Sequence, residues 1–210
     1  MTSDAWCKGD ERELLFMDRV AGLLRFYDME YNQTRTINIS DRSHGVCTCG
    51  EYIFIANNQN ACIYVYDYEG NIVRTIGLGY QPAGLIQIGD NIHVIDYIFT
   101  GIRIYDLEFN LLTSIPLGYQ PVDLTRYNDY IIVVQMNTAT VRIYDTEYNL
   151  VRTITLPQSV RGVTRIHNNL LFTQQNGLGV WFYDIEENLL RTEIAPNGYI
   201  HLHTRYFYHE

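Results

Sequence analysis

The sequence has no long hydrophobic stretch and no apolar leader. No apolar run approaches the ~18–20 residues that a membrane-spanning helix needs. The first residues, Met1–Lys8, are mostly polar and lack the hydrophobic core of a secretory signal peptide. We therefore predict a soluble, cytoplasmic (intracellular) protein that does not act at a membrane.

The chain also has little positive charge. Its formal net charge is −9 at pH 7, and all of its basic residues are arginines except Lys8. Proteins that bind nucleic acids gain much of their affinity by neutralising phosphates. The composition therefore predicts that nucleic acid is not a partner.

Cysteine is scarce, and its spacing matches no common site. The cysteines are Cys7, Cys47, Cys49 and Cys62. A chain of 210 residues with 47% hydrophobic content can build its own core without disulfides, so we predict reduced thiols. Cys47 and Cys49 form a C-x-C pattern, whereas zinc and redox sites typically use C-x-x-C.

Common catalytic motifs are missing as well. The sequence contains no G-x-S-x-G, no H-E-x-x-H and no phosphate-binding glycine loop. We therefore predict a protein that is not an enzyme and carries no cofactor.

An internal repeat is the strongest feature of the sequence. The dipeptide Tyr-Asp recurs every 39 residues, at Tyr27-Asp28, Tyr66-Asp67, Tyr105-Asp106, Tyr144-Asp145 and Tyr183-Asp184. A glutamate and an asparagine follow each Asp, and most copies continue with Arg-Thr. A fixed period of this length is typical of a repeat architecture.

Each repeat contains four short apolar runs separated by turn residues. In the third copy the runs are 83–88, 91–95, 102–107 and 111–117. Short runs rich in Ile, Val, Tyr and Thr indicate strands rather than helices. Four strands in about 40 residues are typical of a propeller blade. The sequence therefore predicts an all-β, five-bladed β-propeller.

The two ends of the chain are expected to share one blade. Residues 14–17 correspond to the second strand of a unit, and residues 199–205 correspond to a first strand. Pairing these segments would close the ring and leave no free edge between the first and last blades. The predicted domains are an N-terminal tail, 1–12, and one propeller, 13–210.

The repeat resembles the NHL-type propeller repeat. The similarity is carried by Pro82-x-Gly84-Leu85, by Gly89-Asp90-Asn91, by the strand that ends in Tyr105-Asp106, and by Arg74-Thr75-Ile76. It covers nearly the whole chain and implies a propeller fold. Members of that family bind RNA, bind proteins, or act as lyases and hydrolases, so the resemblance leaves the function open.

The repeated Asp-x-Glu-x-Asn segment lies between the third and fourth strands. We expect the Asp carboxylate to cap the turn and the Asn to adopt the left-handed conformation that ends it. The acidic residues of these turns should give one face of the ring a negative potential. Calcium binding at these turns is a weaker alternative.

The opposite face is predicted to bind a partner. It carries the loops between second and third strands and between fourth and first strands, which are rich in tyrosines and amides. Such a rim suits contacts with a protein or with sugar hydroxyls. The candidate binding residues are Tyr80, Gln81, Tyr97, Phe99, Tyr119, Gln120, Asn58, Gln135, Asn137 and Gln175.

The first strands should line the centre of the ring. Aligning them by the repeat places Gly45, Gly84, Asp123, Gly162 and His201 at one level. His203 and Cys47 follow at the next level. His201, His203, Asp123 and Cys47 are thus weak candidates for a transition-metal site.

Three functions remain open from the sequence. The leading hypothesis is a non-catalytic interaction scaffold or adaptor that binds a protein. The second is a small carbohydrate-binding propeller with repeated shallow sites. The third is a hydrolase or lyase with a metal in the channel. A glycosidase would need a pair of carboxylates at a set distance, and the inner strands supply only Asp123.

Overall fold

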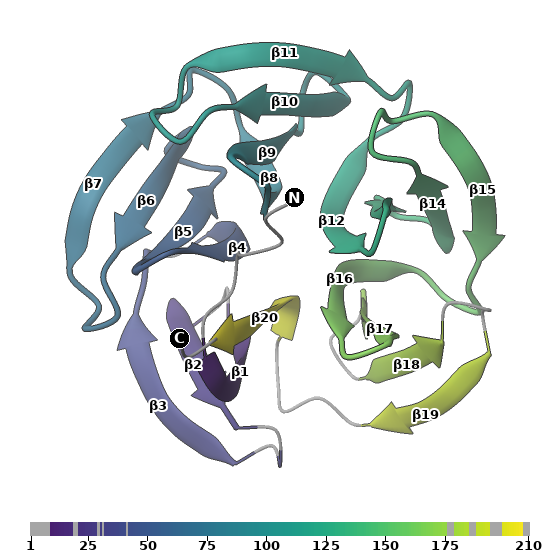
Figure 1. Ribbon diagram of the computed structural model, residues 1–210, viewed down its shortest axis with the longest axis horizontal. Coiled ribbons are helices and arrows are strands. Elements are labelled where there is room, and N and C mark those ends of the chain that lie inside the picture. The colour runs from purple at the N-terminus through teal and green to yellow at the C-terminus, as the bar shows by residue number, and fades with distance from the viewer. Residues whose placement is uncertain are drawn as a thin grey trace, which may run out of the picture.

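The computed structural model of the chain is a ring of β-sheets (Figure 1). It describes residues 9–18, 21–28, 30, 32–40, 42–175, 179–184, 188–193 and 199–207; the side chains of 9–12, 191, 193 and 199–207 are outside this description. Within these ranges the chain forms 20 strands and no helix. The strands form five sheets of four, each antiparallel, which confirms the predicted five-bladed β-propeller.

The blades follow one another along the chain, except that the first is shared by both ends. Blade 1 consists of β20 (Tyr199–Phe207), β1 (Gly9–Asp18), β2 (Leu23–Tyr27) and β3 (Gln33–Asn38). Blade 2 consists of β4 (Ser43–Cys49), β5 (Tyr52–Asn57), β6 (Cys62–Tyr66) and β7 (Ile72–Gly77). Blade 3 consists of β8 (Pro82–Ile88), β9 (Asn91–Asp96), β10 (Gly101–Tyr105) and β11 (Leu111–Pro116).

The remaining two blades have the same order. Blade 4 consists of β12 (Pro121–Tyr127), β13 (Tyr130–Gln135), β14 (Thr140–Tyr144) and β15 (Leu150–Thr155). Blade 5 consists of β16 (Val160–Ile166), β17 (Asn169–Gln174), β18 (Val180–Asp184) and β19 (Leu189–Glu193). In every blade the first strand along the repeat lies at the centre of the ring and the fourth at its circumference (Figure 1).

The ring closes through β1 and β20, as the sequence predicts. These strands pair antiparallel with Met17 opposite His201. This is the same rung that joins Gly45 to Ala56 in blade 2 and Asp123 to Val134 in blade 4. The repeat register therefore continues unshifted from Leu14 to Met17 in the closing blade. Strand β1 begins at Gly9, within the segment that the sequence analysis assigned to a tail; residues 1–8 lie outside the described residues.

The hydrophobic core lies between the blades. Each pair of neighbouring blades encloses one apolar cluster, because side chains alternate between the two faces of a strand. Between blades 3 and 4, Ile95 and Ile102 meet Leu124 and Val133, all almost fully buried. Equivalent clusters fill the other four junctions. Each blade thus depends on both neighbours for the burial of its apolar surface.

The repeated aspartates cap the turns between third and fourth strands. In all five copies one carboxylate oxygen accepts the backbone N–H of the Asn four residues later, at 2.7–2.8 Å. The other oxygen accepts the Asn side-chain amide at 2.8–3.0 Å. These bonds hold the pKa of Asp28, Asp67, Asp106 and Asp145 below its usual value.

The prediction that the Asn adopts the left-handed conformation is wrong. The residue before it has the positive φ instead: Gly70 (φ 92°), Phe109 (φ 68°) and Tyr148 (φ 65°). The Asn is fixed by its two bonds to Asp. A bulky residue in this conformation is uncommon, and at both Phe109 and Tyr148 the side chain packs into the junction with the preceding blade.

The centre of the ring is closely packed. A Cβ atom on Gly45 would lie 2.5 Å from the Ala83 carbonyl oxygen and 2.8 Å from the Gly84 Cα. A Cβ atom on Gly84 would lie 2.6 Å from Asp123 Oδ1 and 2.9 Å from its Cα. Glycine at these positions is what allows the inner strands of blades 2, 3 and 4 to approach one another.

Replacing Gly84 by alanine should therefore destabilise the ring. The new methyl group meets backbone on its neighbour and cannot move aside, so we expect a loss of roughly 1–3 kcal/mol in the free energy of unfolding. Gly77→Ala is the matched control, because a Cβ there meets nothing within 4 Å. Urea unfolding of both variants would measure the difference. Equal midpoints would contradict the close approach.

Candidate functional site

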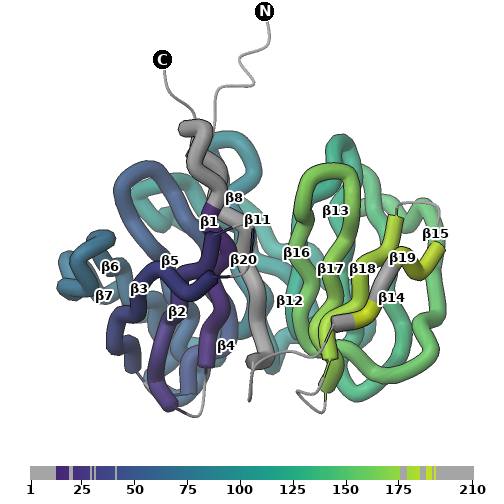
Figure 2. Tube along the Cα trace, turned by 90° about the horizontal axis from the view of Figure 1, so that it is seen from below, coloured from purple at the N-terminus to yellow at the C-terminus, as the bar shows by residue number. Residues whose placement is uncertain are grey.

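The strand directions give the ring two different faces. First and third strands run toward one face, which carries the turns from first to second and from third to fourth strands; we call it the turn face. Second and fourth strands run toward the other, which carries the longer loops; we call it the loop face. Figure 2 shows the ring from the side, with the strands running between these faces. All ten candidate binding residues belong to strand ends and loops of the loop face.

Tyr80 is buried in the contact between blades 2 and 3. It is 8% exposed, and its hydroxyl accepts a hydrogen bond from the Tyr105 hydroxyl at 3.0 Å. The Arg103 guanidinium lies over its ring, 4.5 Å from the centroid. Burial raises the pKa of Tyr80 well above its usual value. Most of this side chain is consumed by internal contacts.

Tyr119 repeats this arrangement one blade later. Its hydroxyl is 3.0 Å from that of Tyr144, and the Arg142 guanidinium lies 3.8 Å from its ring centroid. Arg142 also donates to the Gln135 side-chain oxygen. The Gly-Tyr-Gln-Pro repeat therefore builds two inter-blade contacts at equivalent places, in which the hydroxyls of Tyr80 and Tyr119 are hydrogen-bonded to those of Tyr105 and Tyr144.

The amide side chains connect neighbouring loops. Asn58 donates to the Pro82 carbonyl oxygen and Gln120 to the Tyr97 carbonyl oxygen, both at 3.4 Å. Gln175 donates to the Asn137 side-chain oxygen at 3.0 Å. At Gln81 the backbone carbonyl accepts the Tyr97 N–H at 3.0 Å. Together these bonds brace the loop face from blade to blade.

The loop between β9 and β10 presents the exposed apolar part of this face. Ile98 is 67% exposed and Phe99 is 40% exposed. Tyr97 is half-buried, and its hydroxyl donates to Met136 Sδ at 3.0 Å. Ile98 was not among the candidate residues, although the run Tyr97-Ile98-Phe99 is visible in the sequence.

A buried carboxylate holds this loop in place. Asp96 is 1% exposed, and its Oδ1 accepts the backbone N–H groups of Ile98 and Phe99, both at 3.0 Å. Its Oδ2 accepts a hydrogen bond from Arg103 Nε at 2.8 Å and forms an ion pair with Arg103 Nη2, also at 2.8 Å. The same Arg103 carries its guanidinium over Tyr80 and lies 5.5 Å from the Phe99 ring. The two apolar side chains are therefore displayed on a rigid turn.

The predicted metal candidates near the centre are engaged in other contacts where the structure describes them. Asp123 Oδ1 accepts the Leu124 N–H at 3.0 Å, and its Oδ2 accepts the Val163 N–H of the next blade at 2.9 Å. Cys47 is buried among apolar residues between blades 2 and 3, and this burial raises the pKa of its thiol well above the usual value.

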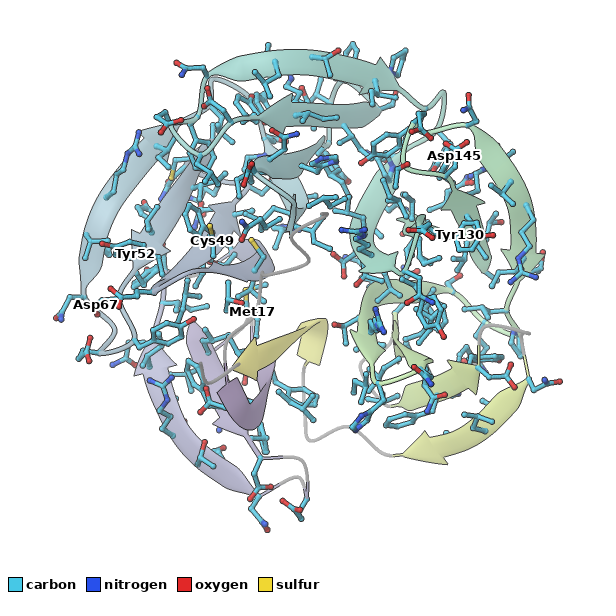
Figure 3. All side chains as sticks on the ribbon, in the orientation of Figure 1. Met17, Cys49, Tyr52, Asp67, Tyr130 and Asp145 are labelled. Carbon is cyan, nitrogen blue, oxygen red and sulfur yellow. The ribbon has the colours of Figure 1, made fainter. Side chains whose placement is uncertain are left out.

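The histidine part of that prediction stays a prediction. His201 and His203 lie in β20, and their side chains fall outside the described residues. Among the side chains that the structure does describe, no group of three or more His, Cys, Asp or Glu is close enough to hold a metal ion. Cys49 and Met17 also lie toward the centre, whereas Asp67 and Asp145 lie farther out (Figure 3).

One buried ionisable pair joins blades 3 and 4. His93 Nδ1 and the Tyr148 hydroxyl share a hydrogen bond of 2.7 Å, and both side chains are buried. Burial lowers the pKa of His93 from 6.5 to about 4, because the charged imidazolium is disfavoured away from water. In the preceding repeat the equivalent residues are Phe54 and Phe109, whose rings stack at 5.8 Å.

This pair should make stability depend on pH. Between about pH 6.5 and 4 the unfolded chain binds a proton at His93 and the folded chain does not, so this contribution is complete above that range and is lost as pH falls through it. We expect a loss of roughly 3 kcal/mol from this group. The double variant His93→Phe/Tyr148→Phe copies the preceding repeat and should remove that part of the pH dependence in urea unfolding. Parallel pH profiles for the two proteins would contradict the assignment.

Comparisons by sequence do not identify a family for the chain. No protein-family model matches the chain, and no curated protein matches its sequence. The NHL-type resemblance therefore remains a prediction. No helix among the described residues is long and apolar enough to span a membrane.

Several solved structures share the architecture. A protein of unknown function from Bacteroides caccae superposes with a TM-score of 0.66 at 10% identity, covering 93% of this chain and 99% of its own. A chain of the nidogen/laminin complex gives 0.65 at 18% identity, over 90% and 83%. Virginiamycin B lyase from Staphylococcus aureus gives 0.60 at 11% identity, over 91% and 69%. At these identities the likeness shows the β-propeller fold alone.

Proposed function

We propose that this chain is a non-catalytic interaction module that binds a partner protein through its loop face, with Ile98 and Phe99 as the anchor. The observation that carries the proposal is the exposure of these two adjacent apolar side chains, 67% and 40%, on a turn held by the buried Asp96. Large apolar side chains on a rigid support lose little conformational entropy when they are buried by a partner.

The surroundings of the anchor suit a protein interface. Polar amides from the neighbouring loops, including Asn58, Gln120 and Gln175, lie on the same face. An apolar centre with a polar rim is the usual anatomy of a protein interface. Because these amides are already bonded between loops, the face changes little in shape on binding, which favours affinity.

The carbohydrate alternative has weaker support. Sugar-binding sites use open aromatic faces and free hydrogen-bonding groups. The two recurring tyrosines, Tyr80 and Tyr119, have arginines over their rings and their hydroxyls bonded to other tyrosines. The repeated part of the loop face is thus committed to internal contacts.

The catalytic alternative also has little to build on among the described side chains. Solved relatives of this fold include virginiamycin B lyase, so the fold itself is compatible with catalysis. On the loop face, however, Asp18 and Asp96 pair with Arg25 and Arg103. Both oxygens of Asp123 accept backbone N–H groups. Carboxylates held in this way are poorly placed to act as a general acid and base.

The test replaces the two anchor side chains and leaves the residues that hold their turn unchanged. Ile98→Ser/Phe99→Ser keeps Asp96 and Arg103, so the turn should remain folded. Wild-type protein would be used to isolate a partner from the source cells, and the affinity of that purified partner would then be measured by calorimetry. We expect the double variant to bind at least about 30-fold more weakly, as for a typical interface hot spot.

The matched control is Tyr52→Ser. Tyr52 is 44% exposed and begins β5 on the turn face, so its replacement removes an exposed aromatic side chain away from the anchor. It should leave the affinity within about twofold, since exposed positions outside an interface contribute little. Either of two results would overturn the proposal. One is a partner that binds the anchor variant as tightly as wild type, and the other is an enzymatic activity of the wild-type protein that the anchor variant retains.

A further inference from the structure

A second surface of the molecule combines exposed aliphatic side chains with negative charge. Four of the five outer strands begin with two aliphatic residues, each 50–55% exposed. These pairs are Ile72-Val73, Leu111-Leu112, Leu150-Val151 and Leu189-Leu190. Each pair directly follows an Asp-x-Glu-x-Asn turn, so the pairs lie around the edge of the turn face. We call them the aliphatic rim.

The fold does not require these residues to be apolar. In blade 1 the same two positions are Gln33 and Thr34, and β3 pairs with β2 through the same bulge after the third strand. The rung from Tyr27 to Gln33 corresponds to the rung from Tyr66 to Ile72. Since a polar pair gives the same backbone, strand formation does not explain the aliphatic side chains in the other four blades.

The bulge also indicates how a partner would bind. In β7 the bulge places Val73 between Ile72, which is opposite Tyr66, and Arg74, which is opposite Val65. Bulges at an outer strand twist the edge away from a flat ladder and discourage the addition of another strand. The side chains of the rim, rather than the backbone edge, are therefore the available contact.

The turn face beside the rim is acidic. Its described carboxylates include Asp28, Glu30, Glu51, Asp67, Glu69, Asp90, Asp106, Glu108, Asp129, Asp145, Glu147 and Asp184. Several arginines on this side are turned to internal acceptors: Arg74 donates to the Glu108 carbonyl oxygen, Arg126 to that of Asn128 and Arg165 to that of His167. A field of one sign over such a surface attracts a partner of the opposite sign.

We propose that the turn face and its aliphatic rim form a docking surface for a protein segment that presents basic and aliphatic side chains together. The aliphatic side chains of that segment cover the rim, and its basic side chains meet the exposed carboxylates of the adjoining turns, such as Glu69, Glu108 and Glu147. A second copy of this chain is a poor occupant, because it brings the same acidic surface and a formal net charge of −9.

The repetition adds to the binding. Because similar subsites occur in four blades, a partner with several basic-aliphatic segments gains affinity by engaging more than one of them. This surface is separate from the Ile98–Phe99 anchor on the opposite face. The two proposals can therefore fail independently.

The test uses short synthetic peptides as probes. One peptide alternates lysine and leucine, and its matched control replaces each leucine by serine and keeps the charge. Fluorescence anisotropy at physiological ionic strength would measure both affinities for the full chain. We expect the lysine-leucine peptide to bind at least about tenfold more tightly, since only this peptide buries the rim.

Variants copied from blade 1 test the location. Leu111→Gln/Leu112→Thr combined with Leu150→Gln/Val151→Thr should weaken the lysine-leucine peptide by about tenfold. The reverse change, Gln33→Leu/Thr34→Leu, adds a fifth pair and should strengthen it. Because blade 1 already carries Gln and Thr here, the polar variant should keep its urea midpoint, which checks that the fold is retained.

Three results would overturn this inference. The first is equal affinity of the two peptides, which would mean that charge alone drives binding. The second is unchanged affinity in the polar variant with the fold retained. The third is self-association of the wild-type chain in sedimentation velocity that the polar variant abolishes, because a second copy would then be the occupant of the rim.

Discussion

The pairing of β1 with β20 is the contact on which the rest of the ring depends. Each apolar cluster lies between two blades, so a blade at an open end would expose one complete face. The antiparallel pairing of these two strands, in which Met17 lies opposite His201, leaves neither end of the ring open. It also buries the cluster between blades 5 and 1. This pairing joins residues far apart in the chain, so closure imposes an entropic cost that the five junctions together must offset.

The fold could be predicted because the repeat specifies local structure and register together. A period of 39 residues fixes which residues occupy equivalent rungs, and even the closing rung follows the same offset. The period does not show which side chains of neighbouring blades contact one another across a junction. Tyr80 and Tyr119 were expected on the surface, yet their hydroxyls meet Tyr105 and Tyr144, which lie 25 residues away in each case. The turn motif was correct for Asp and wrong for Asn, because the side-chain bonds of Asn replace the left-handed conformation expected of it.

The third repeat departs from the others in its contacts with neighbouring blades and in its exposed side chains. Arg35 and Arg74 each donate to a carbonyl oxygen in the next blade, at Tyr68 and Glu108. The third repeat has Thr113 at this position, and the junction of blades 3 and 4 contains the His93–Tyr148 bond instead. The same repeat supplies the exposed Ile98 and Phe99. Blade 3 thus differs from its neighbours both in the hydrogen bond that joins it to the next blade and in the apolar side chains that it exposes.

The two proposed surfaces follow from one property of the architecture. Stability comes from the junctions and from the centre, where Gly45 and Gly84 allow the inner strands to meet. The exposed first two positions of the outer strands contribute little to either, as the polar Gln33 and Thr34 of blade 1 illustrate. Side chains there can change without loss of the fold, so exposed apolar groups at these positions have no structural explanation. The proposed anchor, Ile98 and Phe99, and the proposed aliphatic rim lie on opposite faces of the ring, so the two proposals together imply that one chain could connect two partners.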